Sequence, residues 1–461
     1  MHREGLAEYA VLWLYLAALA WTPFWYGSND LIAWGINAVL FPGLAILYEA
    51  SLLVRAKPHP VALRELAVPA SMFVLVVGWI AFQTLTWDRL PFANPIWQMA
   101  AGALARKVHG SISVDRDLTN LALMRLLTAA SAFWVALQLC RDGRRARLLI
   151  ASIAGIGAAY AVYGLIAAKL GQLPWLDIPA SDYVTATFIN HDSFATYAGI
   201  CGVAAVGLIL RHFQNEMDAV SGSWRYSVSA LIEACGPQGV ILLAAGFVLL
   251  VALLLTGSRG GTIATGIAIV ALGLLMRRRG AERDRQSLTT IAVGLIAVVA
   301  MVFAFGGVIG GALEERGISD ANRLAVYTLT IRSILDAPIT GFGYGTFREV
   351  FRMYRDRSLS VDGIWGQAHD TYLEVLQGLG LVFGLLLIGC VVLLVFRCIK
   401  GAWHRQENAI VPQVAASAAC LVGVHALVDF SLQIQAVALT FMALLGAGVA
   451  QSESSRISIE D

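Results

Sequence analysis

Arg259 is the most conspicuous charged residue of the chain, because it interrupts a long apolar stretch. Residues 234–276 are broken only by Ser258-Arg259-Gly260-Gly261. Two membrane-spanning helices need about 40 residues, so almost none remain for a loop. We therefore expect a tight, glycine-assisted hairpin that holds Arg259 at or slightly below a membrane boundary. A guanidinium group there either extends to lipid headgroups or binds an anion in a cavity that opens outward.

His369 has the chemistry of a general base. The sequence Thr371-Tyr372-Leu373-Glu374 fits a capping box, so we expect Asp370 and Thr371 at the start of a helix. His369 then lies at the positive end of a helix dipole, which favours the neutral imidazole that can accept a proton. The alternative is an ordinary solvated loop histidine.

A polar segment that contains Asn190 and His191 precedes the apolar stretch 193–210. Asp192 or Ser193 is the simplest N-cap for the helix that this stretch predicts. The segment is expected on the same side of the membrane as Arg259.

His425 and Asp429 are four residues apart near the end of another predicted helix. At that spacing two side chains share a face of a helix and can pair. The pair either stabilises the fold or contributes to a site.

Residues 310–371 form the largest predicted segment outside the membrane. They hold seven arginines, no lysine and eight acidic residues. Much of this charge can pair locally, which would make the segment a solvated, salt-bridged cap. Guanidinium groups, however, suit bidentate phosphate binding, and the use of arginine without lysine is suggestive of an anion site.

Two elements are predicted within this segment. Residues 321–335 read as an amphipathic helix that Asp320 or Asn322 caps and that Asp336-Ala337-Pro338 ends. The glycines of Gly341–Phe347 have the wrong spacing for a nucleotide-binding loop and lack a strand–turn–helix context. They predict a tight turn that packs aromatic side chains near the bilayer.

The composition indicates a membrane protein. Hydrophobic residues make up 58% and charged residues 14% of the 461-residue chain, against about 25% charged residues in soluble domains. The net charge of +2 gives no indication of a nucleic-acid partner. The sequence shows no His/Glu metal-ligand spacing, Walker motif or nucleophile elbow, so we expect neither a metal nor another cofactor.

The predicted fold is all-α and polytopic: a single integral membrane domain, residues 1–461, with about twelve transmembrane helices. The segment 310–371 forms a large outer loop with short helices between the ninth and tenth of them. One span, 126–140, is long enough only if Arg125 extends to the membrane surface. The apolar stretches that predict the helices are 9–29, 31–48, 66–87, 126–140, 148–168, 193–210, 234–258, 260–276, 286–313, 375–396, 408–428 and 430–452.

Basic residues predict the orientation of these helices. They gather in alternate short connections, which the positive-inside rule places in the cytoplasm together with both termini. Arg259, Arg323 and His369 are then expected on the outer side. The clustered basic residues are Arg55, Lys57, Arg64, Arg141, Arg144, Arg145, Arg147, Arg211, Arg225, Arg277, Arg278, Arg279, Arg283, Arg285, Arg397, Lys400 and Arg405.

The order of these motifs resembles the O-antigen ligase/polymerase superfamily of bacterial surface-polysaccharide assembly. The resemblance spans about residues 185–450 and rests on several short motifs together. They are Thr187–His191, Ser258–Gly261, Asn322-Arg323, Gly341–Phe347, His369-Asp370-x-Tyr372, Gly378-x-Gly380 and His425-x-x-x-Asp429-Phe430.

The resemblance implies a glycosyltransferase of the bacterial inner membrane with a periplasmic active site. Members move a glycan from an undecaprenyl-pyrophosphate carrier to an acceptor hydroxyl, without nucleotide sugar or metal. Arg259 and Arg323 match the arginines proposed to hold the pyrophosphate, and His369 matches the histidine proposed to activate the acceptor. Supporting roles are assigned to Arg332, Asn190, His191, Asp370, His425 and Asp429.

The acceptor stays open between a growing glycan, lipid A-core and a protein hydroxyl. These acceptors correspond to a polymerase, a ligase and a protein O-oligosaccharyltransferase, and the absence of an appended soluble domain disfavours the last. A transporter or flippase of lipid-linked saccharides is the alternative from another class. It should show paired halves and polar or broken helices at the membrane midplane, whereas the conspicuous charges here cluster on one side.

Overall fold

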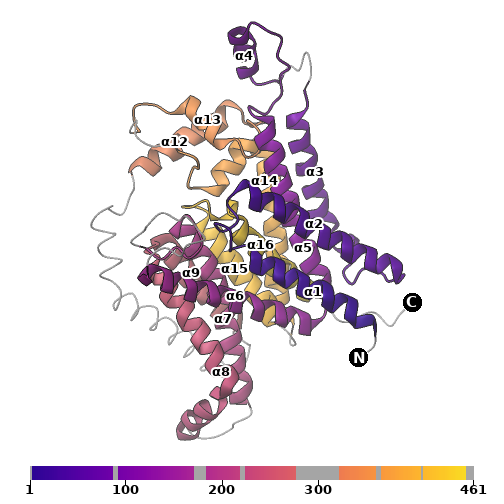
Figure 1. Ribbon diagram of the computed structural model, residues 1–461, viewed down its shortest axis with the longest axis vertical. Helices are drawn as coiled ribbons and strands as arrows, with labels where there is room; N and C mark the ends of the chain where they lie inside the picture. Colours follow the sequence, from indigo (N-terminus) through magenta and orange to yellow (C-terminus); the bar gives the residue numbers. More distant parts are fainter. Residues whose placement is uncertain are drawn as a thin grey trace.

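The chain folds into a bundle of α-helices. The structure, a computed structural model, describes residues 3–86, 92–170, 183–218, 224–276, 321–359, 365–405 and 409–452. No β-strand occurs among these residues, so the prediction of an all-α fold is confirmed. Figure 1 shows the long helices packed side by side, with α4, α12 and α13 together toward one end.

The elements, in chain order, are α1 (Arg3–Trp21), α2 (Leu31–Val54), η1 (Leu63–Leu66), α3 (Ala67–Thr84), α4 (Ile96–Leu104), α5 (Arg116–Leu139), α6 (Gly143–Leu170), α7 (His191–Asp218), α8 (Trp224–Leu255), α9 (Arg259–Met276), α12 (Ala321–Asp336), α13 (Phe347–Tyr354), α14 (Thr371–His404), α15 (Ile410–His425), η2 (Ser431–Gln433) and α16 (Gln435–Ser452).

Most of these helices suit a membrane. Within the described residues nine helices are long and apolar enough to cross a bilayer, and the apolar part of α1 (Ala7–Trp21) and α15 are shorter. Every predicted span has its helix, except 286–313, which lies outside the described residues. Large apolar side chains also face outward: Val39 of α2 and Val74 of α3 are 73% and 66% exposed. Lipid is the environment that fits such a surface.

The predicted role of Arg125 is wrong. α5 begins at Arg116, so the span does not depend on an arginine that reaches the membrane surface. Arg125 instead points into the bundle, where its guanidinium group lies over the ring of Trp34 at 4.3 Å and donates to the backbone carbonyl of Gln433. An internal partner replaces the lipid headgroup that the prediction assumed.

The helices alternate in direction, and this gives the bundle two ends. At one, here called the basic end, Arg55 pairs with Glu8 at 3.2 Å, and Arg145 pairs with the same carboxylate. Arg141 donates to the carbonyl of Ala450 at 3.0 Å at this end as well. These three basic residues, which the sequence predicts to lie on one side of the membrane, share an end of the bundle.

The opposite end is here called the site end, and α9, α14 and α16 begin there. Hydrogen bonds between distant segments hold it together. Asn37 of α2 donates to Gln435 of α16 at 2.8 Å, and the backbone of Ala436 donates to Gly27 at 3.1 Å. Arg259 and His369 both lie at this end, as their helix starts require.

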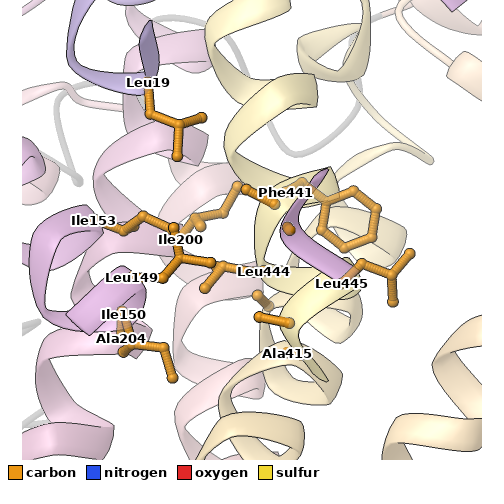
Figure 2. Close-up of a cluster of buried hydrophobic side chains, with 14 of the residues drawn as sticks. Leu19, Leu149, Ile150, Ile153, Ile200, Ala204, Ala415, Phe441, Leu444 and Leu445 are labelled. Atoms are coloured by element: carbon orange, nitrogen blue, oxygen red, sulfur yellow. The ribbon is translucent and has the colours of Figure 1, made fainter. Parts of the chain in front are cut away.

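The centre of the bundle is built from α6, α7 and α16. Figure 2 shows Ile153, Ile200 and Leu444 from these three helices within one buried cluster. α16 also approaches α5 closely, because a Cβ atom on Gly446 would lie 2.4 Å from the carbonyl oxygen of Phe133. This rigid centre supports the loops of the site end.

Candidate functional site

His369 lies on a strained turn directly before α14. Its φ angle is 57°, in the left-handed region that side chains other than glycine rarely adopt. Asp370 caps the helix by accepting from the backbone of Leu373 at 2.9 Å, and Thr371 is the first helical residue, so the predicted helix start is confirmed. The predicted capping box differs, because Glu374 accepts from the backbone N–H of Ala368 at 2.5 Å.

The His369 imidazole faces a buried carboxylate. Its Nδ1 atom lies 3.9 Å from Oδ1 of Asp429, whose side chain is 2% exposed, while the imidazole itself is 24% exposed. Phe430 contacts the ring edge-on, with centroids 5.0 Å apart. The hydroxyl of Tyr327 donates to the His369 carbonyl at 2.9 Å. The backbone of His369 is therefore held from α12 and its imidazole by the segment that joins α15 to α16, yet the ring stays partly accessible.

The predicted pairing of His425 with Asp429 on one helical face is wrong, because α15 ends at His425. Asp429 lies beyond the helix, and the two residues are linked through a chain of hydroxyl groups. His425 Nδ1 lies 2.6 Å from Oγ1 of Thr196, which lies 2.8 Å from Oγ of Ser431. Ser431 in turn donates to Asp429. The outcome is a buried polar chain that connects α7, α15 and η2.

Burial changes the acidity of Asp429. Burial raises the pKa of this carboxyl from 3.8 to about 6, and the nearby carboxylate of Asp192 acts in the same direction. Hydrogen bonds from Ser431 and from the backbone of Phe430, and the charge of Arg323, oppose the increase. Asp429 is thus a carboxyl whose pKa, at about 6, lies well above that of an exposed aspartate.

Arg323 reaches the same segment from α12. Its Nη1 atom donates to the carbonyl of Val428 at 3.2 Å, and its charge acts on Asp192, His425 and Asp429. The helix that carries it confirms the predicted amphipathic helix. Asn322 lies inside that helix and is not its cap; Asp320 is outside the described residues.

Arg259 is the first residue of α9 and follows a tight turn after α8, as the hairpin prediction requires. Gly257 has a φ angle of 65° in this turn, and the Ser258 hydroxyl accepts from the backbone of Gly261 at 3.1 Å. A Cβ atom on Gly260 would lie 2.8 Å from the Nε2 atom of His425. Arg259 therefore adjoins the residue that packs against the buried polar chain.

The N-cap of α7 is Asn190, so the prediction of Asp192 or Ser193 is wrong. Asn190 accepts from the backbone N–H of Asp192 at 2.7 Å, which satisfies a donor at the helix start. His191 stacks on Tyr183 with centroids 4.9 Å apart, and its Nδ1 atom lies 3.8 Å from the Asp192 carboxylate. Asp192 also hydrogen-bonds with Ser258, which ties this segment to the α8–α9 turn.

Arg332 is not brought into this group. It is exposed on α12, and its charge acts on Tyr354 and Asp356. The structure instead brings Thr196 and Glu374 into this group. Nothing in the sequence distinguishes Thr196, whereas Glu374 could have been found as a charged residue at the start of a predicted membrane helix.

The glycine-rich segment forms the predicted turn, which packs against a break in α14. Gly341, Gly343 and Gly345 all have positive φ angles, and Gly380 interrupts α14 with φ 75° and ψ 169°. The backbone of Gly343 donates to Gly378 at 3.0 Å. This contact helps to satisfy a carbonyl that the break in the helix leaves without an intrahelical partner.

Side chains of α3 complete this arrangement. Gln83 donates to the carbonyls of Thr340 and Gly378, both at 2.8 Å, and Trp79 donates to that of Leu379 at 3.1 Å. α3 therefore fixes the first turns of α14, which carry His369 at their start.

The site contains cationic, carboxylate and imidazole groups. Across the part of the chain that the structure describes, no group of three or more His, Cys, Asp or Glu side chains is arranged to hold a metal ion. The arrangement can bind an anion through Arg259 and Arg323, and it can accept a proton at His369.

A comparison with protein families found a match to this chain. Residues 244–389 match the family model described as O-Antigen ligase. A comparison with curated proteins gave no match. The family match confirms the resemblance to the O-antigen ligase/polymerase family over a segment that holds Arg259, Arg323 and His369.

Proposed function

We propose, from the premise that residues 244–389 match the O-antigen ligase family, that this membrane enzyme of surface-polysaccharide assembly transfers a glycan from a polyprenyl-pyrophosphate donor. The carrier is undecaprenyl pyrophosphate, and the acceptor is a hydroxyl group of a glycan or of lipid A-core. The reaction takes place at the periplasmic face of the bacterial inner membrane and uses no metal or other cofactor.

The observation that carries this proposal is the pairing of His369 with Asp429 beside a guanidinium group. The imidazole lies 3.9 Å from the carboxylate, and Arg323 donates to Val428, the residue that precedes Asp429. A base and an anion-binding cation thus converge on one short segment. Transfer from a pyrophosphate donor needs both groups.

His369 acts as the general base. Because Nδ1 faces Asp429, we assign Nε2 to the acceptor hydroxyl. As Nε2 takes the proton, the hydroxyl oxygen forms a bond to the anomeric carbon of the donor sugar. The bond from that carbon to the pyrophosphate oxygen breaks, and its electron pair leaves with the lipid pyrophosphate. Asp429 stabilises the imidazolium that forms, as a carboxylate does in a catalytic triad.

Arg259 and Arg323 bind the pyrophosphate. The departing group gains negative charge as the sugar bond breaks, and fixed guanidinium groups stabilise that charge most strongly in a partly desolvated site. Both arginines lie at helix starts, where the helix dipoles add positive potential. The third arginine of the prediction, Arg332, is exposed on the same helix as Arg323 and has no role in this proposal.

The separation of the two ends supports a periplasmic site. Three of the clustered basic residues, Arg55, Arg141 and Arg145, share the basic end, and the positive-inside rule assigns such an end to the cytoplasm. Arg259, Arg323 and His369 lie at the other end. A transporter would instead place its polar residues near the middle of the membrane.

Transfer by purified protein in liposomes tests the site. Wild type should convert a lipid-linked glycan donor, and R259A, R323A and H369A should each lose at least about 100-fold in rate, as expected for lost charge stabilisation or base catalysis. R348A removes an exposed arginine of α13 and should keep wild-type rates. Full activity in both R259A and H369A would refute the assignment.

The acceptor is found by deleting the gene and sizing the surface glycans of the strain. Single repeat units would indicate a lost polymerase, and unattached polymer would indicate a lost ligase. Loss of surface glycan, together with lost uptake of a lipid-linked saccharide into vesicles, would support the transporter instead.

A further inference from the structure

Glu374 lies one turn into α14, and both its carboxylate oxygens are hydrogen-bonded. Oε1 accepts from the backbone N–H of Ala368 at 2.5 Å, and Oε2 accepts from the side-chain amide of Gln433. Ala368 is fully buried and directly precedes His369. The carboxylate therefore connects the backbone of the proposed base to η2.

η2 also contacts Asp429, which lies two residues before it in the chain. Ser431 and Gln433 both belong to this short helix, and the Ser431 hydroxyl donates to Asp429. One carboxylate group thus holds the backbone next to His369 on one side and the segment that supports Asp429 on the other.

The conformation of His369 shows why such a bridge is needed. A non-glycine residue in the left-handed region is strained and persists only where its surroundings enforce it. With a φ angle of 57°, His369 is enforced from both sides: Tyr327 binds its carbonyl at 2.9 Å, and Glu374 binds the preceding N–H.

Arg125 anchors the far side of the bridge. Its guanidinium group donates to the backbone carbonyl of Gln433 and lies over the ring of Trp34. Its charge and that of Glu374 act on one another. η2 is thereby fixed to α2 and α5, helices that carry none of the proposed catalytic groups.

We propose that Glu374 is a positioning residue, which sets the geometry of the His369–Asp429 pair by joining the Ala368 backbone to Gln433, with Arg125 as the anchor of η2. This inference rests on the proposed function, because it gives His369 the role of base. Glu374 itself does not touch the substrate.

Three variants test the inference in the liposome transfer assay. E374A removes both hydrogen bonds and should lower kcat about 10- to 100-fold with little change in the KM for the donor, because a displacement of about 1 Å is enough for such a loss. In E374Q the new side-chain carbonyl can still accept from Ala368, and the Gln433 amide can turn so that its oxygen accepts from the new NH₂ group. The kcat of E374Q should therefore stay within about threefold of that of wild type.

Q138A is the matched control. Gln138 accepts from the Val61 backbone N–H at 3.1 Å and donates to the Val61 carbonyl at 2.9 Å, which makes it a similar bridge at the basic end. Both alanine variants should lower the unfolding temperature, but only E374A should lower kcat. Wild-type kcat in E374A, or an equal loss in Q138A or E374Q, would overturn the inference.

A spectroscopic measurement separates this inference from the proposed function. The chain has eight histidines, so the imidazole carbon signal of His369 can be identified by its absence in H369A. That signal should move in E374A and stay in place in Q138A, whether or not the protein transfers glycan. A signal that E374A leaves unchanged would refute the positioning role, whereas wild type without transfer would refute only the proposed function.

Discussion

Replacement of Asp429 by asparagine should stabilise the protein at neutral pH while it lowers the rate of glycan transfer. The folded protein binds a proton at this carboxyl more tightly than the unfolded chain does, because burial raises its pKa from 3.8 to about 6. As the pH rises from about 4 to about 6, wild type loses that proton and part of its stability. The asparagine has no proton to lose and can still accept from the Ser431 hydroxyl.

The size of the stability difference between D429N and wild type follows from the pKa shift of Asp429. Each pKa unit corresponds to 1.36 kcal/mol, so a rise from 3.8 to about 6 amounts to about 3 kcal/mol. The free energy of unfolding of D429N should therefore exceed that of wild type by up to about 3 kcal/mol above pH 6 and match it below pH 4. The charges of His369 and Arg323 near the carboxylate reduce the measured difference.

Thermal unfolding in detergent at pH 4 and pH 7.5 measures this difference, and the transfer assay at pH 7.5 measures activity. D30N is a suitable control, because asparagine also caps a helix and should cap α2 as Asp30 does. We expect D429N to unfold at a higher temperature than wild type only at pH 7.5 and to transfer at least about tenfold more slowly. A stability difference that is equal at both pH values, or a less stable D429N at pH 7.5, would show that the buried charge does not act as argued.

Two further substitutions test the packing of the site end. G380A should destabilise the protein by about 2–4 kcal/mol, because glycine alone adopts this conformation readily and the new Cβ atom would lie 2.4 Å from a backbone carbonyl. The control G78A, whose new Cβ atom meets no atom within 4 Å, should not destabilise the protein. Equal unfolding temperatures for the two variants would contradict this prediction. T196V should cost about 1–3 kcal/mol by leaving the buried Nδ1 atom of His425 without its partner. T328V, which changes an exposed threonine, should be near neutral in the same thermal assay, and a T196V protein as stable as T328V would count against the polar chain.

The length and placement of the apolar stretches determined which parts of the chain cross the membrane. Charge-free runs of about 20 residues predict spanning helices because the bilayer core excludes unpaired charges. The tight turn at Arg259 followed from the same arithmetic, since residues 234–276 leave no room for a loop. Basic residues likewise predicted that the connections holding Arg55, Arg141 and Arg145 share an end. These properties depend on local sequence and on the membrane as solvent, so they can be predicted from residues that are close together in the chain.

Tertiary structure alone decided which polar groups meet. Asp429 lies with His369 and not with His425, because α15 ends before the fourth residue that helical spacing would need. Arg125 turns inward because Trp34 and Gln433 come from other segments to receive it.

The backbone of His369 is the clearest case. Nothing in its neighbours along the chain demands a left-handed residue, and Tyr327 comes from a separate helix to hold it there. Such contacts join residues that are far apart in sequence, and their energy depends on distance and burial, which exist only once the bundle has packed.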